Sequence, residues 1–375
     1  MRIFQLLRHL NILGHVIDLV SFHQADQGTN VETVQYCRDS FAFLYDSFQP
    51  ARFESLLGYL SPKPRSLVGT HSPQLFKKVE ELSSRERYDM AILSQIDMLP
   101  YRKAIGNIPC FLEEIEIGVY VDRFEKQRGL KSARGKLTFS KLASYLRKES
   151  KDLVGMSVVS EQERDLVLRW VKPSCPIEVI QNGVDTDGNQ PFVGKFEIEP
   201  LSMVFAGSLT YSANLEAMAF FTHRVLPIIL DKFPSAKLYI TGKYQGCDLN
   251  QLNLCPSVVL TGYLSDVRPR VASSVVSVAP LFSGGGTRLK ILESLSLGTP
   301  VVSTEKGAEG LASLAESGVV IANEPTKIAD QIARLFIDPA WRAALSKSGK
   351  MSVESQYSWN QTLRPFSRLV SKINR

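Results

Sequence analysis

The sequence predicts an α/β protein made of two doubly wound parallel-sheet domains that face each other across a cleft. Apolar runs of strand length alternate with helical patterns along the chain, as expected for parallel strands covered on both faces. The alternation starts afresh at Ser202, after a crossing that carries Pro191 and Pro200. A length of 375 residues fits two domains of ordinary size.

The first domain is predicted to span residues 1–183, with a linker over residues 184–200. Short apolar runs bounded by turn residues predict its strands. These strands are His15–Phe22, Tyr88–Ser94, Asn107–Glu113, Asp152–Ser160 and Ile177–Ile180. A helix is expected over Glu161–Trp170, and Asn182-Gly183 gives a turn at the end of the domain.

The second domain is predicted to span residues 201–355 and to repeat the same βα pattern. Its expected strands are Ser202–Gly207, Lys237–Gly242, Val258–Thr261 and Val275–Ala279, with a helix over Asn214–Phe233. In open sheets of this kind, ligands bind at the carboxyl ends of the strands. Motifs that follow a strand are therefore the first candidates for a site.

The stretch Ser283–Glu293, which follows the last of these strands, predicts a phosphate cradle. Gly284, Gly285 and Gly286 let backbone N–H groups approach an anion closely, and Thr287 is a good helix N-cap. The alternative is an ordinary glycine-rich turn in a βαβ unit.

Three charged residues follow the glycines. Arg288 and Lys290 are cations at the expected start of the helix, and Glu293 falls at the edge of its apolar stripe. A carboxylate there is costly to desolvate unless a donor reaches it, and a sugar diol would serve. The motif thus combines groups suited to phosphate and to sugar hydroxyls.

Composition indicates a soluble globular protein in a reducing compartment. The chain is 44% hydrophobic, and no apolar run approaches the ~18 residues that span a bilayer. Five widely spaced cysteines show neither a disulfide framework nor ligand spacing. We expect a cytoplasmic protein.

The net charge of +6 is unevenly spread. Residues 122–151 contain ten Lys and Arg residues and three acidic residues, a net charge of +7. The rest of the chain therefore has a net charge of −1. A solvated helix face is the plain interpretation, and peripheral contact with an anionic membrane or with an acidic acceptor is the alternative. Few aromatic residues lie among these cations, which argues against nucleic acid.

No metal site is predicted. Asp185-Thr186-Asp187 mimics a metal-binding D-x-D, but it follows a turn at the domain crossing and not a strand that faces a nucleotide pocket. The five histidines lack ligand spacing, and no nucleophilic Ser or Cys has a paired base.

Several segments resemble family 4 glycosyltransferases, which have the GT-B fold of two Rossmann-like domains. The donor-binding half of that family is matched by Phe205–Leu209, Gly262–Arg268, Ala279–Leu281, the glycine cradle and Gly307–Leu311. Asn182–Asp185 resembles the interdomain signature, and Ser160–Arg164 resembles the helix start before it. Tyr357–Trp359 resembles the start of a C-terminal helix, residues 356–375, that crosses back to the first domain.

This resemblance implies retaining transfer of a hexose from a nucleotide-diphosphosugar to a saccharide or lipid-linked acceptor, without metal or other cofactor. Glu293 matches the second glutamate of the family's E-x7-E motif, which binds ribose, whereas the first glutamate falls on Gly285. The family's usual Arg and Lys fall near Ser208 and Asn214, so Arg288 and Lys290 become the candidates that balance the leaving diphosphate.

The remaining expected donor contacts are the turn after the first strand of the second domain, Gly207 and Ser208, and the amides of Gly284 to Thr287. In the first domain, Glu113, Glu114 and Glu116 stand where many family members carry an acidic motif with a histidine. Glu114 and Glu116 are candidates to orient or deprotonate the acceptor hydroxyl. The alternative is that these acids cap or solvate the next helix.

The resemblance leaves two other functions open, a catalytically silent GT-B subunit and a nucleotide-sugar epimerase or hydrolase. It also implies that the first strand of the first domain is missing. Family members open with a strand and a glycine-containing loop before a helix that resembles Arg2–Leu10, and here Met1 directly precedes that helix. Without this central strand, two parallel edges stay unpaired. We expect translation to begin upstream of Met1, with a poorly folded or inactive remnant as the other interpretation.

Overall fold

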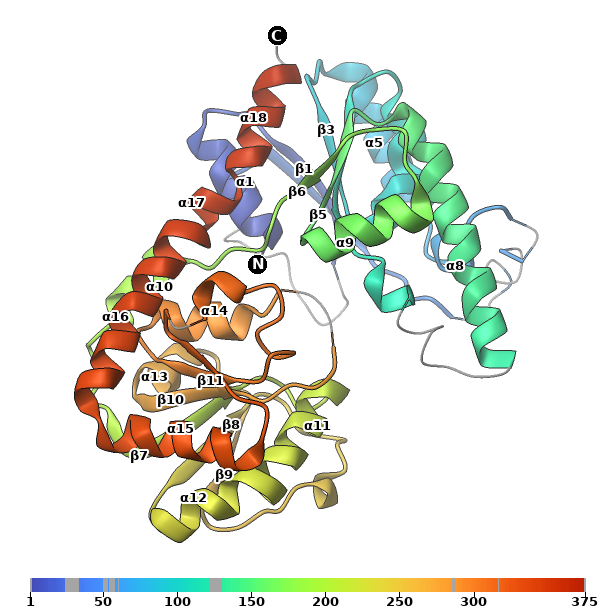
Figure 1. Cartoon of the computed structure of the whole chain (residues 1–375). Coiled ribbons are helices and arrows are strands. Elements are labelled where there is room, and N and C mark those ends of the chain that lie inside the picture. Colours follow the sequence, from blue (N-terminus) through green and yellow to red (C-terminus); the bar gives the residue numbers. More distant parts are fainter. Residues whose placement is uncertain are drawn as a thin grey trace. The chain divides into compact units, whose positions relative to one another are not determined.

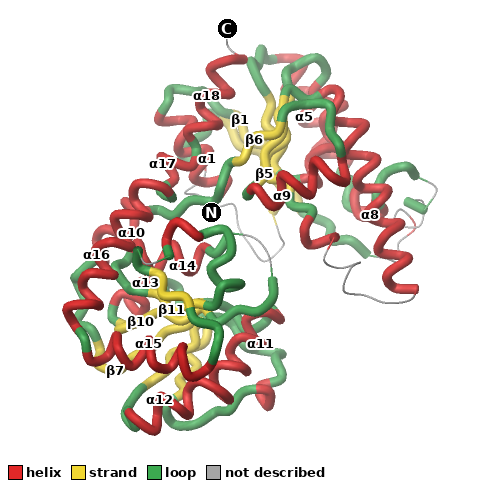
Figure 2. The backbone as a smooth tube through the Cα atoms, in the orientation of Figure 1, coloured by secondary structure: helices red, strands yellow, loops and turns green. Residues whose placement is uncertain are grey.

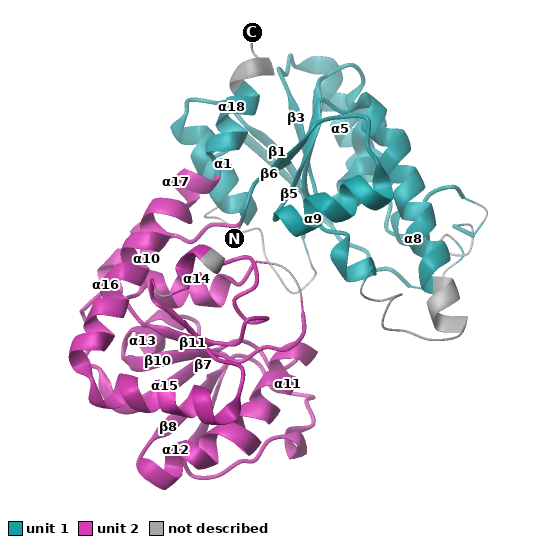
Figure 3. Cartoon of the chain, viewed as in Figure 1, with its two compact units in different colours: residues 1–181, 363–375 teal, residues 182–362 magenta. Residues whose placement is uncertain are grey.

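The chain forms two compact units in the computed structural model. The structure describes residues 2–23, 34–49, 53, 58–59, 61–121, 130–284, 287–315 and 317–373. Unit 1 comprises Met1–Gln181 and Leu363–Arg375, and unit 2 comprises Asn182–Thr362 (Figure 3). Residues 184–200, expected to be a linker, are counted with unit 2.

Unit 1 contains parallel strands in two separate sheets (Figure 1). The strands are β1 (Asp18–His23), β2 (Asp39–Leu44), β3 (Ala91–Ser94), β4 (Cys110–Ile115), β5 (Gly155–Val158) and β6 (Ile177–Val179). β1 pairs with β2, and the second sheet has the order β3-β4-β5-β6. All these pairings are parallel, which confirms the predicted class of sheet.

The helices of unit 1 pack against these strands. They are α1 (Arg2–Ile12), α4 (Arg65–Gly69), α5 (Pro73–Arg85), α6 (Arg102–Ile105), α8 (Leu130–Glu149), α9 (Glu161–Leu166) and α18 (Arg364–Ile373). The helix expected over Glu161–Trp170 changes after Leu166 into a π-helical turn, Val167–Val171. Arg147 donates to the carbonyls of Trp170 and Val171, which supplies partners where that wider turn ends.

Unit 2 is built on one parallel sheet of six strands, in the order β12-β11-β10-β7-β8-β9. The strands are β7 (Glu199–Ala206), β8 (Lys237–Thr241), β9 (Val258–Gly262), β10 (Ser274–Ala279), β11 (Val301–Ser303) and β12 (Val319–Ile321). Successive residues of β7 such as Met203, Val204 and Phe205 are all fully buried. Because neighbouring side chains of a strand point to opposite faces, this sheet is covered on both sides.

The helices of unit 2 surround these strands (Figure 2). They are α10 (Thr186–Asn189), α11 (Ser212–Phe220), α12 (Leu226–Lys232), α13 (Arg268–Ala272), α14 (Leu289–Ser296), α15 (Pro325–Ile337), α16 (Pro339–Gln356) and α17 (Trp359–Thr362). The single helix expected over Asn214–Phe233 is divided by a π-helical turn, Phe221–Val225. Pro227 begins the next turn, and because proline lacks an N–H it cannot continue the regular hydrogen-bond ladder.

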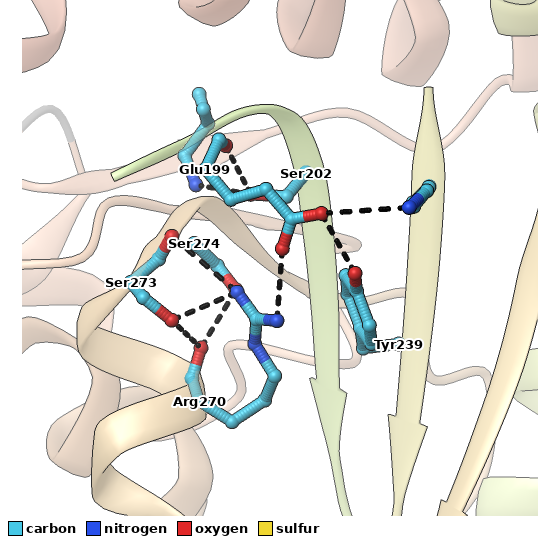
Figure 4. A network of polar contacts seen from close by, with 8 residues as sticks. Glu199, Ser202, Tyr239, Arg270, Ser273 and Ser274 are labelled. Carbon is cyan, nitrogen blue, oxygen red and sulfur yellow. Dashed lines mark hydrogen bonds and ion pairs between the residues drawn. The ribbon is translucent and has the colours of Figure 1, made fainter. Parts of the chain in front are cut away.

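A polar network joins the amino ends of β7 and β10 to α13 (Figure 4). The Arg270 guanidinium lies 2.9 Å from the Glu199 carboxylate and donates to the Ser273 hydroxyl at 2.8 Å. The Tyr239 hydroxyl donates to the same carboxylate at 2.7 Å. These donors keep Glu199 ionised, and its pKa is lowered although partial burial opposes that change. The network fixes the strands at the edge opposite their carboxyl ends.

We expect Arg270→Met to reduce the free energy of unfolding of unit 2 by about 1–2 kcal/mol, because it removes the closer of the two cations that pair with Glu199. Urea denaturation measures this loss. Lys232→Met is the matched control, since it removes an exposed ion pair with Asp330 and should change stability little. An Arg270 variant no less stable than the Lys232 variant would show that the network is dispensable.

Candidate functional site

The carboxyl ends of β7 and β8 approach each other closely through two glycines. Gly242 follows β8 with φ of +96°, and a Cβ there would lie 2.8 Å from the backbone N and Cα of Ser208. The Ser208 hydroxyl donates to the carbonyl of Lys243 at 2.8 Å and thereby joins the two loops. The turn of Gly207 and Ser208 is thus held rigidly at the edge where such sheets bind ligands.

A half-buried cation at this edge is Lys290, on α14. Its ammonium group donates to the Asn214 side-chain oxygen at 2.9 Å and lies 4.0 Å from the centre of the Phe205 ring. A Cβ on Gly207 would come within 2.9 Å of the same nitrogen, so the lysine lies directly against the turn after β7. Burial, and secondly the charge of Arg288, lowers the pKa of Lys290 to about 7.

Asn214 holds this lysine in place. Its side-chain NH2 donates to the Ser208 carbonyl at 2.7 Å while its oxygen accepts from Lys290. Sequence reasoning noted Asn214 only as a position without a cation. The structure shows that a lysine 76 residues further along the chain reaches it. No local spacing rule could have joined the two.

Arg288 contacts two backbone carbonyls and one carboxylate. Its guanidinium, 6% exposed, donates from one nitrogen to the carbonyls of Gly284 at 2.9 Å and Lys306 at 3.0 Å. It also lies 3.7 Å from the Glu309 carboxylate. These contacts tie the glycine turn to the loop after β11. That Arg288 offsets the negative charge of a leaving diphosphate remains a prediction.

The glycine turn differs from the expected helix start. The N-cap of α14 is Arg288, without a side-chain cap, so the prediction that Thr287 caps the helix is wrong. The Thr287 hydroxyl instead accepts from the Asn182 side chain at 3.4 Å. Gly284 has φ of +90°, a conformation that suits glycine. Gly285 and Gly286 lie outside the described residues.

Glu293 lies one turn beyond Lys290 on α14, half-buried. Burial raises the pKa of its carboxyl group, against the opposing charge of Arg268. Arg268 itself is held by two hydrogen bonds of 2.8 Å to Asp266. Within the part of the chain that the structure describes, no hydrogen bond or ion pair satisfies the Glu293 carboxylate. A half-buried carboxylate of this kind can accept hydrogen bonds from a ligand.

In unit 1 the three candidate carboxylates take different positions at the end of β4. Glu113 is buried and pairs with Arg2 of α1 at 2.6 Å, and burial raises its pKa against that charge. Glu114 has φ of +61° and accepts from Gln95, which has φ of +67°, at 3.2 Å. Burial first, then the charges of Glu114 and Glu163, raises the pKa of Glu116. Strained backbone of this sort accumulates at functional sites.

The Asp185-Thr186-Asp187 sequence starts a helix. The Asp185 carboxylate accepts from the Gly188 N–H at 3.0 Å and caps α10. Among the described residues, no group of three or more His, Cys, Asp or Glu side chains is placed to hold a metal ion.

Most of the basic stretch that the structure describes lies on helix α8. Residues 122–129 of that stretch lie outside the described residues. In the described ranges, no helix is both long and apolar enough to cross a membrane.

Residues 200–338, from β7 to the end of α15, match the family described as Glycosyl transferases group 1. Parallel sheets in both units agree with this match, and solved structures that are similar to the chain share the architecture. Residues 200–338 are therefore similar to group 1 glycosyltransferases, and the chain as a whole has a fold of two Rossmann-like domains.

Two relatives are similar to part of the chain. An uncharacterised 44.6 kDa protein of the cps region of Klebsiella pneumoniae is 24% identical over 146 residues, which is 37% of this chain and 38% of that protein. A GDP-mannose-dependent monoacylated alpha-(1-6)-phosphatidylinositol monomannoside mannosyltransferase of Corynebacterium glutamicum is 26% identical over 149 residues, 36% of this chain and 39% of that protein. The chain thus covers less than two fifths of the length of either relative.

Among solved structures, sucrose-phosphate synthase of Thermosynechococcus elongatus has a TM-score of 0.68 at 15% identity, covering 98% of this chain and 92% of that one. A glycosyltransferase of Rickettsia africae has a TM-score of 0.67 at 14% identity, covering 100% and 94%. HepE of Anabaena, in complex with UDP and glucose, has a TM-score of 0.59 at 12% identity, covering 94% and 99%. At these identities the likeness shows the fold.

Proposed function

We propose that this chain transfers a hexose from a nucleotide-diphosphosugar to a hydroxyl of a saccharide or lipid-linked acceptor, with retention of configuration. The observation that carries the proposal is the pair Lys290 and Glu293 on α14, a half-buried cation beside the turn after β7 and a half-buried carboxylate with no donor among the described residues. Three residues apart on a helix, they lie on the same side, where one ligand can contact both. The named ligands of HepE and of the mannosyltransferase are of this chemical class.

In this proposal Lys290 stabilises the charge that develops on the diphosphate as the glycosidic bond breaks. Asn214 holds its ammonium group towards the Gly207 turn. The Glu293 carboxylate accepts hydrogen bonds from the ribose hydroxyls, and Arg288 orders the glycine turn around the phosphates. Because the lysine supplies the positive charge, transfer proceeds without a divalent metal. Addition of a chelator should leave the rate unchanged.

We assign the acceptor to unit 1, where Glu114 and Glu116 orient its hydroxyl. Glu113 is not assigned this part, since its carboxylate is buried against Arg2. The basic residues of α8 support the further proposal that this acceptor is anionic or membrane-bound. Sedimentation with anionic vesicles at low salt that fades towards ~0.5 M salt would support it. Absence of low-salt binding would favour a solvated helix face.

Donor binding should depend on pH through Lys290. Its pKa is about 7 in the free protein, and a bound diphosphate favours the ammonium form and raises that value. Above pH 7 the free lysine is neutral, so binding takes up a proton, and affinity falls by up to about tenfold per pH unit. Calorimetry of UDP binding at pH 8 in buffers of different ionisation heat should show uptake of about one proton. The same uptake in Lys290→Met would contradict this assignment.

Consumption of an α-linked donor distinguishes the three functions considered. A transferase consumes UDP-glucose or GDP-mannose only with acceptor, a hydrolase consumes it without, and a silent subunit binds it without turnover. Product NMR then decides the stereochemistry, because retention gives an α-linked product. An epimerase would instead yield the isomeric nucleotide sugar. A thermal-shift panel should come first, since a ligand at ~100 times its Kd adds about 2.7 kcal/mol to stability.

A further inference from the structure

Glu163, on α9, is bonded to the segment that follows β4. Its carboxylate accepts a hydrogen bond from the N–H of Ile117 at 2.8 Å and another from the N–H of Gly118 at 3.0 Å. These two residues directly follow Glu116, one of the carboxylates that we assign to the acceptor. A contact with a helix 46 residues further along the chain therefore fixes the backbone on one side of Glu116.

The helix and the segment fit closely at Gly118. A Cβ on this residue would overlap Oε1 of Glu163, so glycine leaves room for the carboxylate. Glu163 also lies in the first turn of α9, where its N–H donates to the hydroxyl of the N-cap residue Ser160 at 3.2 Å. That cap fixes the backbone that carries the carboxylate. The contact thus joins a capped helix start to a glycine.

The backbone on the other side of Glu116 is held by β5. The pairing of β4 with β5 shifts between Leu112 and Ile115, where β4 has one residue more than its partner. Glu114, with its positive φ, lies in this bulge, and its N–H donates to the Ser157 hydroxyl at 3.1 Å. Bulges next to functional sites change the direction of side chains. The chain is therefore fixed both before and after Glu116.

The carboxyl group of Glu116 itself has no protein partner. Within the described ranges, no hydrogen bond or ion pair reaches this half-buried group. By contrast, Glu114 accepts from Gln95, and Glu163 accepts from two N–H groups. Burial raises the pKa of Glu116, and the charges of Glu114 and Glu163 raise it further. The charge of Arg2 opposes this rise. A carboxyl group on a fixed backbone, with both oxygens available, suits contact with a ligand hydroxyl.

We propose that Glu163 is a positioning residue of the acceptor site, which clamps the amides of Ile117 and Gly118 so that Glu116 meets the acceptor hydroxyl. Its negative charge has a second effect, because it opposes ionisation of Glu116 and so makes that carboxylate, once ionised, a stronger hydrogen-bond acceptor. The inference rests on the proposed function. It adds to that function a residue outside the three glutamates that the sequence indicated.

Two substitutions separate the clamp from the charge. Glu163→Ala removes both, whereas Glu163→Gln keeps an oxygen that can accept from the N–H groups and removes only the charge. Glu161→Ala, in the same turn of α9, is the matched control, since it removes only an exposed ion pair with Arg164 at 3.1 Å. A further variant, Gly118→Ala, displaces the carboxylate from the other side of the contact.

Hydrogen exchange of residues 115–121, read by mass spectrometry, measures the clamp without any substrate. We expect exchange there to become about 10-fold faster or more in Glu163→Ala and in Gly118→Ala, and to stay unchanged in the control. Because both substitutions break one contact, the double variant should exchange no faster than either single variant. Unchanged exchange in Glu163→Ala would overturn the proposal.

Transfer kinetics measure the effect on the acceptor, with UDP-glucose or GDP-mannose as donor and octyl glucoside, galactoside and mannoside as probe acceptors. For the probe that the native chain uses best, kcat/KM for the acceptor should fall about 10- to 100-fold in Glu163→Ala, with KM for the donor unchanged. Glu163→Gln should retain most of the rate. Its pH profile should have an acidic limb at lower pH, because loss of the neighbouring charge lowers the pKa of Glu116.

The outcomes distinguish this inference from the proposed function. Transfer by the native chain together with native acceptor kinetics in Glu163→Ala would overturn the inference alone. An equal loss for donor and acceptor with a lower Tm would show a general structural role and overturn it as well. An unshifted acidic limb in Glu163→Gln would contradict the assignment of Glu116 as the group on which Glu163 acts. Absence of transfer by the native chain to every probe would overturn both.

Discussion

Lys290→Met is expected to lower kcat/KM for sugar transfer by about 10²- to 10³-fold, the largest effect of any substitution considered. The ammonium group lies directly against the Gly207 turn, and the loss of one preorganised donor typically removes this much transition-state stabilisation. UDP affinity should fall by less than kcat does, because the leaving diphosphate gains charge only as the bond breaks. Steady-state kinetics and calorimetry measure the two effects separately.

The stability of this variant provides its control. Methionine keeps the apolar stem beside Phe205 and removes a charge that is costly to bury, so the Tm should not fall. Lys237→Met, at the amino end of β8 in the same sheet, removes a lysine far from the carboxyl edge and should leave kinetics unchanged. Full activity of Lys290→Met would refute its assignment to the diphosphate. A large rise in KM with unchanged kcat would restrict the lysine to holding the donor.

Glu293→Gln should lower the affinity for the nucleoside diphosphate by about 10- to 100-fold. The substitution keeps the shape of the side chain but weakens charge-assisted hydrogen bonds to the ribose diol, worth about 1.5–3 kcal/mol. Calorimetry with UDP and with its 2′,3′-dideoxy analogue separates this contact from the rest. The analogue should bind the native chain more weakly than UDP does. The Glu293→Gln variant should bind the analogue with almost the same affinity as the native chain does.

A matched control for this experiment is Glu354→Gln on α16, where the carboxylate is partly exposed and lies 3.6 Å from Lys350. It should bind UDP as the native chain does. If Glu293→Gln weakens UDP and the dideoxy analogue equally, the carboxylate does not contact the ribose. Unchanged UDP binding in that variant would refute the assignment altogether.

Both predictions depend on contacts that sequence reasoning found only in part. The motif Ser283–Glu293 indicated Lys290 and Glu293 as candidates because cations and a carboxylate follow a glycine run. It did not distinguish Arg288 from Lys290. The structure separates them, since Arg288 contacts the carbonyls of Gly284 and Lys306 while Lys290 lies against the turn after β7.

The three glutamates of unit 1 were likewise equivalent in the sequence. Glu113 is set apart because it is buried and lies 2.6 Å from Arg2, 111 residues away, whereas Glu114 is 3.8 Å from the same guanidinium. Local pattern says nothing about such pairs, because side chains distant in sequence meet only after the strands have taken their order.

The sequence by itself determined the parallel α/β class, the position of most strands and the restart of the pattern at Ser202. These features follow from hydrophobic periodicity and turn residues, which act over a few neighbouring positions. Tertiary structure alone decided that Asn214 holds Lys290, that Thr287 does not cap α14, and that α9 bonds to the segment after β4. Each of these depends on packing between elements far apart in the chain, where burial and hydrogen bonding outweigh local preference.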